Sequence, residues 1–500
     1  MTPTGSRPPW WLVALLVALA FAFQGTRGIW EPDEGRYSAT GINMLESGDY
    51  LVPTVDGEHP HLTKPPLTYW ALAGSFGAFG YDEWAARLPA ALAFIATGLL
   101  VFALGRRFTP TRPWLPALVW ALSLGPLIGA NVVSTDALLM LFETAAMLAF
   151  DEAWHSDGAT RRRWVVAMWL AWGLAFLTKG PPGLLPLLAM LLFLGVHDRA
   201  RLRGLFPPSG VALFCIIAFT WFALIVRKDP ELLGYFLGYE VYGRVFSSTH
   251  ARNAEWYGAF KVYLPVLAAG ALPWWILALV AAGGVRGAWR QLRERVAARR
   301  RDWLLLLYWF LVPLAVFFAS KSRLQLYVLP LFVPLALIVA RPLARWRWLD
   351  RRRLAVMSTV TALAIVSIKG LVAYAPSDRD ARVMAAAIRE IVDPHGIEEI
   401  AFVDMRGFYG LQLYLDVNIE SVRTGVRDGQ QPAQIVEEEL CAEFMEREDN
   451  VYALKETRSA RFLSAVSQCG MPLPVQLGAF EADGHRILLY VVPAASEGRG

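Results

Sequence analysis

Apolar residues occur in long runs over the first three quarters of the chain. About eleven of these runs approach the roughly 20 residues that an α-helix needs to cross the hydrocarbon core of a membrane. The pattern therefore predicts a polytopic helical bundle with spans at residues 10–24, 85–105, 114–130, 136–151, 163–178, 181–196, 208–227, 261–283, 302–319, 323–341 and 353–374. One added pair of spans would give thirteen.

Two apolar segments differ from an ordinary internal span. The run from Trp10 to Phe23 does not end in a small-residue cleavage site, so we expect a retained span rather than a removed signal peptide. The segment from Leu67 to Gly80 is apolar but short and interrupted by glycine. We expect it to be re-entrant or interfacial, because a span here would place every later loop on the opposite side.

The pattern changes after Tyr374, where charged residues become frequent. Helical patterns alternate with short apolar runs, at residues 380–392, 400–403, 432–445, 451–454 and 487–492. Such alternation is typical of a small α/β domain. The sequence thus predicts a transmembrane catalytic domain with outer loops at residues 1–375 and a soluble α/β domain at 376–500.

Composition agrees with this division into two domains, and the distribution of charge predicts which side of the membrane each loop occupies. Hydrophobic residues make up 55% of the chain and the mean hydropathy is +0.38, which excludes an ordinary soluble protein. Arginine clusters lie near residues 106, 162, 201, 290 and 347, and the positive-inside rule places them in the cytoplasm. The loops at 25–84, 131–135, 179–180, 228–260 and 320–322, and the chain after 374, then lie outside, which is the periplasm in a bacterium.

The three cysteines are widely separated and indicate neither a disulfide framework nor a cysteine-based metal site. A bridge between Cys441 and Cys469 is open if the C-terminal domain lies in an oxidising compartment.

The first outer loop carries the most distinctive group of charged residues. A helix is expected from Asp33 to Ser47, lying at the membrane interface and stopped by Gly48. Asp33, Glu34 and Arg36 fall within one turn of it. Carboxylates at a membrane face are costly and are kept mainly for function. This group suits general-base chemistry beside an anion, although a solvated loop end would have the same composition.

Further along the same loop, prolines follow Lys64 and stiffen the backbone that presents it. A lysine at the outer surface suits a lipid phosphate, and the alternative is a snorkelling anchor. His59 and His61 are possible metal ligands, but their spacing to the nearby acids matches no established site. We therefore assign no metal and no required cofactor, with His61 and His250 as the candidates if a metal binds.

The later outer loops add more cations. Asp136 begins a span and suits either a helix cap or a functional acid. Counting the outer cations near the membrane gives Arg36, Lys64, Lys179, Arg244, Lys321 and Arg323. The positive-inside rule expects few of them there. Together with the outer acids they indicate a site for a phosphate-bearing lipid.

At these residues the chain resembles a known family. The sequences EPDEGRY at 31–37, MLESGDYLVP at 44–53, TKPPL at 63–67, FLTKG at 176–180, RVF at 244–246 followed by His250, and KSR at 321–323 occur in the same order and at similar spacing in the polyprenyl-phosphate-sugar-dependent glycosyltransferases of the glycosyltransferase-C superfamily. These include the lipid A aminoarabinose transferases and the protein O-mannosyltransferases. The likeness covers residues 10 to about 375.

The resemblance implies a membrane enzyme that uses an undecaprenyl-phosphate sugar on the periplasmic side of the bacterial inner membrane. It makes Asp33 the catalytic acid and carries roles to Arg36, Lys64 and Asp136. Glu34, Tyr37, His250, Lys321 and Arg323 are further candidate active-site residues, and Lys179 and Arg244 further phosphate ligands. One departure is Thr63, where the aminoarabinose transferase has a glutamate. That difference weakens the transfer of its sugar specificity and of a metal site built on that glutamate.

Two alternatives stay open at this stage. A protein O-mannosyltransferase would use the same chemistry on a protein acceptor. A transporter or flippase of a lipid-linked substrate would carry charges within its spans and often related halves, whereas charged residues here gather on one side and no repeat is visible. No P-loop or glycine-rich dinucleotide motif is present, so the sequence indicates neither nucleotide nor nucleic acid as a partner.

Overall fold

The computed structural model describes residues 7–57, 59–242, 252–298, 300–392, 396–424, 438–444 and 450–493. The chain divides into two compact units. Unit 1 comprises Met1–Gln24, Thr63–Thr68 and Arg87–Leu371, and unit 2 comprises Gly25–Leu62, Tyr69–Ala86 and Val372–Gly500. The predicted domains were two continuous segments, whereas in the structure most of the first outer loop groups with the C-terminal residues.

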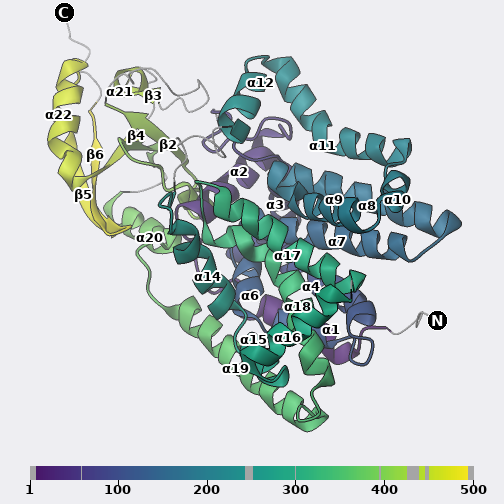
Figure 1. Ribbon diagram of the computed structural model, residues 1–500. Helices are drawn as coiled ribbons and strands as arrows, with labels where there is room; N and C mark the ends of the chain where they lie inside the picture. Colours follow the sequence, from purple (N-terminus) through teal and green to yellow (C-terminus); the bar gives the residue numbers. More distant parts are fainter. Residues whose placement is uncertain are drawn as a thin grey trace, which may run out of the picture. The chain divides into compact units, whose positions relative to one another are not determined.

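Unit 1 is helical (Figure 1). Its helices, including two (α4 and α19) that extend a few residues into unit 2, are α1 (Trp10–Phe21), α4 (Glu83–Phe108), α5 (Leu115–Ala121), α6 (Leu124–Ala130), α7 (Asp136–Trp154), α8 (Gly158–Lys179), η1 (Pro181–Leu184), α9 (Leu185–His197), α10 (Arg199–Leu202), η2 (Arg203–Leu205), α11 (Pro208–Lys228), α12 (Leu232–Gly234), η3 (Tyr235–Tyr242), α14 (Gly258–Gly270), α15 (Trp274–Ala281), α16 (Gly284–Ala297), α17 (Arg301–Ala319), η4 (Gln325–Leu331), α18 (Phe332–Arg345) and α19 (Arg351–Tyr374).

Five helical stretches among the described residues are long and apolar enough to cross a membrane. These five are α4, α11, α17, the continuous stretch η4–α18, and α19. Helices α14 and α15 would together form a sixth, although this pair is bent by 74°. This is fewer than the eleven spans predicted. Part of the difference comes from helix length: the predicted span 114–130 consists of the short helices α5 and α6, and α1 has only 12 residues. Helices α7 and α8 have 19 and 22 residues, but several charged residues in each lower their apolar character. The protein is nevertheless a multi-pass membrane protein.

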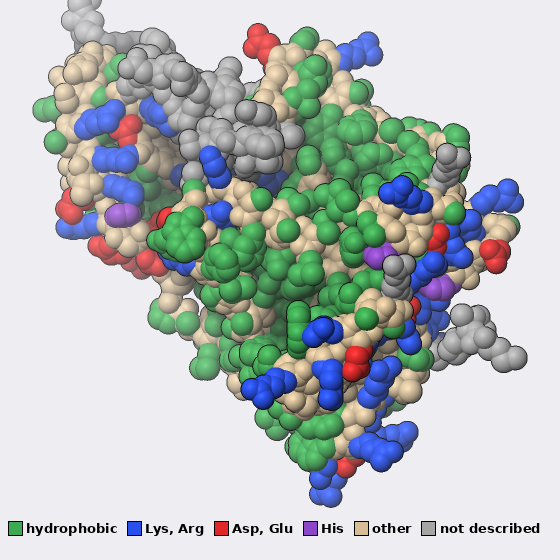
Figure 2. Space-filling view, viewed as in Figure 1, with side chains coloured by type: hydrophobic (Ala, Val, Ile, Leu, Met, Phe, Trp, Pro, Cys, Tyr) green, Lys and Arg blue, Asp and Glu red, His purple; other side chains and the backbone are tan. Residues whose placement is uncertain are grey.

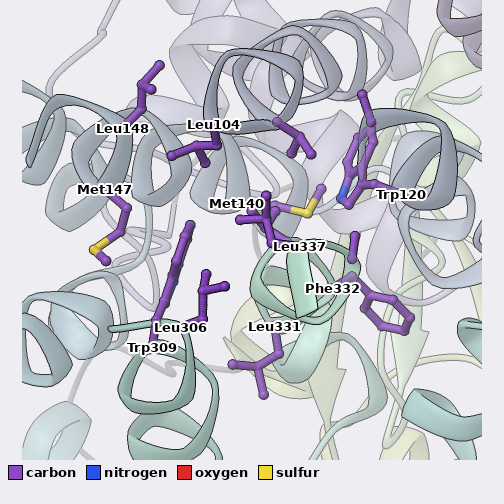
Figure 3. Packing of buried hydrophobic residues seen from close by; sticks show 14 of the residues in the cluster. Leu104, Trp120, Met140, Met147, Leu148, Leu306, Trp309, Leu331, Phe332 and Leu337 are labelled. Carbon is purple, nitrogen blue, oxygen red and sulfur yellow. The ribbon is translucent and has the colours of Figure 1, made fainter. Parts of the chain in front are cut away.

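The core of unit 1 is a continuous layer of large apolar side chains. Trp309 and Leu306 of α17, Met140 of α7 and Phe332 and Leu337 of α18 pack together in it (Figure 3). Other apolar residues face outward, including Val360, Leu363 and Leu371 on α19, which are more than half exposed. Figure 2 shows hydrophobic side chains over much of the helical surface, with Lys and Arg gathered at its margins. An apolar surface of this extent is suited to lipid.

Unit 2 contains a six-stranded sheet with the order β3-β2-β1-β4-β6-β5. Its strands are β1 (Glu399–Val403), β2 (Asn418–Arg423), β3 (Glu438–Glu439), β4 (Asn450–Lys455), β5 (Val475–Ala482) and β6 (His485–Val491). The first four are parallel, and β5 and β6 form an antiparallel hairpin whose turn residues Asp483 and Gly484 both have positive φ. The other elements are the helices α2 (Asp33–Ser47), α3 (Leu67–Phe79), α20 (Ala381–Ile391), η6 (Tyr409–Leu413), α21 (Leu440–Glu443), η7 (Glu456–Arg458) and α22 (Ser459–Gln468).

The predicted C-terminal α/β domain is confirmed in its class and in several elements. Helix α20 and strands β1, β4 and β6 lie where they were predicted. The helix predicted at 432–445 lies partly outside the described residues, and within them β3 occupies Glu438–Glu439 and the short helix α21 occupies Leu440–Glu443. Cys441 and Cys469 form the disulfide that the sequence left open. It ties α21 to the end of α22.

The first outer loop contributes to the core of unit 2. Helix α2 has the predicted bounds, and Gly48 ends it with φ +70°. Ala39 of α2 and Val55 pack in one apolar cluster with residues of α20, η6 and the sheet. Gly41 lies so close to Leu72 of α3 that a Cβ there would come within 2.8 Å of it. Ten of the 15 residues of α2 are buried, so this helix is a core element rather than a peripheral one.

Candidate functional site

The two adjacent acids at the start of α2 lie in opposite environments. Glu34 is 3% exposed and accepts two hydrogen bonds from Arg27, at 2.7 and 3.0 Å, and one from the backbone N–H of Trp30. The Asp33 side chain is 57% exposed and its Oδ1 accepts a hydrogen bond of 2.6 Å from Arg36. A carboxylate held by a bidentate arginine is a structural group. Asp33 is therefore the acid that solvent and a substrate can reach.

A third acid, Glu31, attaches this motif to the C-terminal residues of unit 2. Its carboxyl is buried, and Oε1 accepts a hydrogen bond of 2.5 Å from the backbone N–H of Gly410. The backbone N–H of Glu31 donates to Arg379. Burial raises the pKa of Glu31 to about 8, although the Gly410 N–H and Arg36 oppose the increase. These bonds fix the backbone that carries Asp33.

Tyr37 and His61 approach the same aromatic side chain. The centroid of the buried Tyr37 ring lies 5.7 Å from that of Tyr69, and the centroid of His61 lies 6.3 Å from it. Lys64 belongs to unit 1, where its Nζ donates a hydrogen bond of 2.9 Å to the carbonyl of Thr63. That bond turns the ammonium back over its own backbone, which gives it a defined position.

Unit 1 joins two of the predicted residues directly. Lys179, the last residue of α8, donates a hydrogen bond of 2.5 Å to Oδ1 of Asp136, the first residue of α7. Both side chains are 7% exposed. The Lys179 ammonium also lies 4.5 Å from the ring centre of Tyr327, in a cation–π contact. Asp136 is thus an ion-pair partner, and the structure shows no side-chain cap made by the residue before it.

The remaining candidates have different surroundings. Arg323 is buried, and its guanidinium donates to the carbonyls of Asn253, Glu255 and Phe318. It therefore holds the segment before α14 in place, whereas Lys321 is exposed. Arg244 and His250 lie outside the described residues.

Potential metal ligands gather elsewhere in unit 2. Among the described residues, the one group of three potential ligands consists of Glu399, Glu420 and Glu443, whose carboxylate oxygens lie within 4.8 Å of one another. Nδ1 of His59 lies 3.9 Å from Glu420. Burial, with the neighbouring carboxylates, raises the pKa of Glu420 and favours its neutral form. Oxygen ligands of this kind suit a hard divalent cation. His61 belongs to no such group in the described part of the chain.

The exposed acid and several cations were identified from the sequence, but the residues that hold them in position were not. Arg27 and Glu31 were not singled out, because nothing near them in sequence reveals their partners Glu34 and Gly410. Tyr327 is 148 residues from Lys179 in the chain and was not among the predicted site residues. The three glutamates come from different strands and a short helix, so only the sheet register brings them together. No local signal could have identified them.

Comparisons with known proteins were consistent with the resemblance seen in the sequence. Residues 63–223 match the family model described as dolichyl-phosphate-mannose-protein mannosyltransferase. Two relatives are named undecaprenyl phosphate-alpha-4-amino-4-deoxy-L-arabinose arabinosyl transferase. The one from Sodalis glossinidius is 34% identical over 66% of this chain, and the one from Edwardsiella ictaluri is 32% identical over 66%. The chain matches 58% of the length of each.

A solved structure supports the fold over nearly the whole chain. The crystal structure of ArnT from Cupriavidus metallidurans bound to undecaprenyl phosphate superposes with a TM-score of 0.76 and 20% identity, covering 97% of this chain and 98% of that one. At this identity the match shows the fold. By sequence pattern, family match and fold, the chain resembles the polyprenyl-phosphate-sugar-dependent glycosyltransferases of the glycosyltransferase-C superfamily.

Proposed function

We propose that the protein is a membrane glycosyltransferase that moves a sugar from an undecaprenyl-phosphate donor to an envelope glycolipid such as lipid A. The observation that carries this proposal is the difference in surroundings between the two acids at the start of α2. Glu34 is locked by Arg27, while Asp33 is exposed beside Arg36. Arabinosyl transferases that use an undecaprenyl-phosphate sugar are among the relatives, and their names support the donor class.

The reaction needs a base for the acceptor and cations for the leaving group. A hydroxyl of the acceptor attacks the anomeric carbon and gives its proton to the Asp33 carboxylate. The bond from that carbon to the phosphate oxygen breaks, and the polyprenyl phosphate leaves with the electron pair. We assign stabilisation of its charge to Arg36, Lys64 and Lys179. A positioned base typically contributes about 10²–10⁴ in rate.

We further propose that the reaction takes place on the periplasmic side of the inner membrane. The arginine clusters between the apolar segments support this orientation through the positive-inside rule. The disulfide between Cys441 and Cys469 supports an oxidising compartment for the C-terminal residues. We assign no resident metal to the reaction.

Purified protein in detergent, with a lipid-linked sugar and an acceptor in the same micelles, tests the proposal because no transport step is possible there. We expect the acceptor lipid to gain the mass of the sugar. Asp33→Asn should lower turnover by about 10²-fold or more, while Asp416→Asn, which alters an exposed aspartate of the same unit, should not. Near wild-type turnover of Asp33→Asn would refute the role of Asp33, and absence of transfer from any lipid donor would favour a transporter.

A protein O-mannosyltransferase is the second candidate, favoured by the family match at residues 63–223. It uses the same chemistry, so the acid and the cations do not separate it from the first candidate. The same assay with a Ser- and Thr-rich peptide in place of the lipid decides between them. Gain of sugar mass on the peptide alone would favour this alternative.

A further inference from the structure

Unit 2 contains a pocket of about 200 Å³ that the proposed reaction does not use. It lies where the parallel strands β1 and β4 end, since Asp404 and Arg406 follow β1 and Lys455 is the last residue of β4. Ligands of open α/β sheets bind at the carboxyl ends of the strands. Pro32, directly before Asp33, forms part of the pocket wall.

The pocket carries a surplus of positive charge. Among the described residues, Lys455, Arg458 and His485 line it without an ion pair to any carboxylate. Its two acids are already paired with arginines from outside it: Asp404 lies 3.4 Å from Arg461, and Asp483 lies 3.2 Å from Arg379.

Helical backbone presents Arg458 to the pocket. Arg458 is the last residue of η7 and directly precedes the ten-residue helix α22. Figure 2 shows Lys and Arg side chains gathered with a His on the surface of the C-terminal sheet region.

These features together select the ligand. The arginine fork of Arg458 and the ammonium of Lys455 suit a phosphate group, which accepts several charge-assisted hydrogen bonds. The volume is below the range of about 300–1,000 Å³ typical of pockets for whole small molecules. It fits one phosphate with the atoms next to it, and not a complete glycolipid head group.

We propose that this pocket binds a phosphate monoester on the head group of the acceptor lipid. The inference rests on the proposed function and adds a recognition site for the acceptor. The donor phosphate is assigned to Arg36, Lys64 and Lys179, and none of these three residues lines the pocket. Pro32 lines the pocket and is followed in the chain by Asp33, so we assign the anchored head group a place near the base that receives the acceptor proton.

Kinetics with matched variants test the proposal. We expect Arg458→Gln and Lys455→Gln each to raise the acceptor KM by about ten- to a hundredfold, with the donor KM and kcat within about twofold of wild type. Lys455→Arg should retain most of the affinity. The control is Arg486→Gln, which removes the same charge from an exposed arginine that pairs with Glu456 and does not line the pocket. An unchanged acceptor KM in both pocket variants would overturn the proposal.

A binding measurement separates this inference from the proposed function. The probes are inorganic phosphate and phosphatidic acid, whose head group is a phosphate monoester, each added to the purified protein in detergent micelles, with phosphatidylcholine as the comparison lipid. Wild type should bind phosphatidic acid more tightly than phosphatidylcholine, and Arg458→Gln should lose that difference. If sugar transfer fails while this binding is lost in the variant, the proposed function is wrong and the pocket stands. If phosphate alone binds and neither lipid binding nor the acceptor KM responds to the variants, the pocket is a free-anion site and the inference is wrong.

Discussion

Replacing Glu31 with glutamine should change how the stability of unit 2 depends on pH. The Glu31 carboxyl is buried, its Oε1 accepts the Gly410 N–H, and its Oε2 has no hydrogen-bond partner among the described residues. Glutamine keeps the shape and the accepting oxygen, and its amide resembles the neutral carboxyl in presenting a donor. Glu31→Gln therefore removes only the ability to ionise.

The pKa of Glu31 sets the sign and the size of the effect. Burial raises it from 4.5 to about 8. Below pH 4.5 the carboxyl is neutral in both the folded and the unfolded chain, so its ionisation does not affect stability. Between pH 4.5 and 8 the folded protein holds a proton that the unfolded chain has released, so stability falls by about 1.4 kcal/mol per pH unit. The total loss is at most about 5 kcal/mol, and above pH 8 it stays constant.

Thermal unfolding of purified protein in detergent, followed from pH 5 to pH 9, measures this difference. At pH 5 we expect the melting temperatures of wild type and Glu31→Gln to agree within a few degrees. At pH 8 the variant should melt higher, by about 2–4 °C for each kcal/mol if a unit of about 150–250 residues unfolds cooperatively. Glu390→Gln, at an exposed glutamate of the same unit, is the control. Parallel curves for wild type and Glu31→Gln would refute the account of Glu31 as a buried neutral group.

Three further predictions concern the ion pair, the donor site and the disulfide. Asp136→Asn removes the buried ion pair between Asp136 and Lys179 and should cost about 3–5 kcal/mol of stability, part of which Asp136→Asn combined with Lys179→Met should restore. An unchanged melting temperature in the single variant would contradict the pairing. Lys64→Ala should weaken donor-lipid binding and turnover by about ten- to a hundredfold, with Lys64→Arg retaining part of both; full turnover of Lys64→Ala would exclude a phosphate role. Cys441→Ser opens a bridge with a sequence separation of 28 and should cost about 3–4 kcal/mol in unit 2, measured under oxidising conditions, whereas Cys215→Ser should cost little.

The sequence by itself determined the class of the protein and the boundaries of its strongly patterned elements. Long apolar runs are sufficient to predict a membrane protein, because their length is set by the thickness of the hydrocarbon core. Helix α2 was predicted residue for residue, since an amphipathic stripe followed by a glycine is a local signal. Strands β1, β4 and β6 were predicted from their continuous apolar runs, while β2, β5 and α22 were missed because none of them contains an apolar run of more than two residues.

Tertiary structure decided which members of each candidate group are available for chemistry. Asp33 and Glu34 are equivalent in sequence, yet Glu34 pairs with Arg27 and Asp33 is exposed. Asp136 and Lys179 were separate candidates, and folding joined them across 43 residues. The helix at Asp33–Ser47 was expected to be amphipathic, and the structure shows which residues its apolar side contacts: Ala39 packs in a core cluster of unit 2. In each case the outcome depends on residues that are distant in the chain. Burial and ion pairing are set by the neighbours that a side chain acquires on folding, and the local sequence pattern does not identify those neighbours.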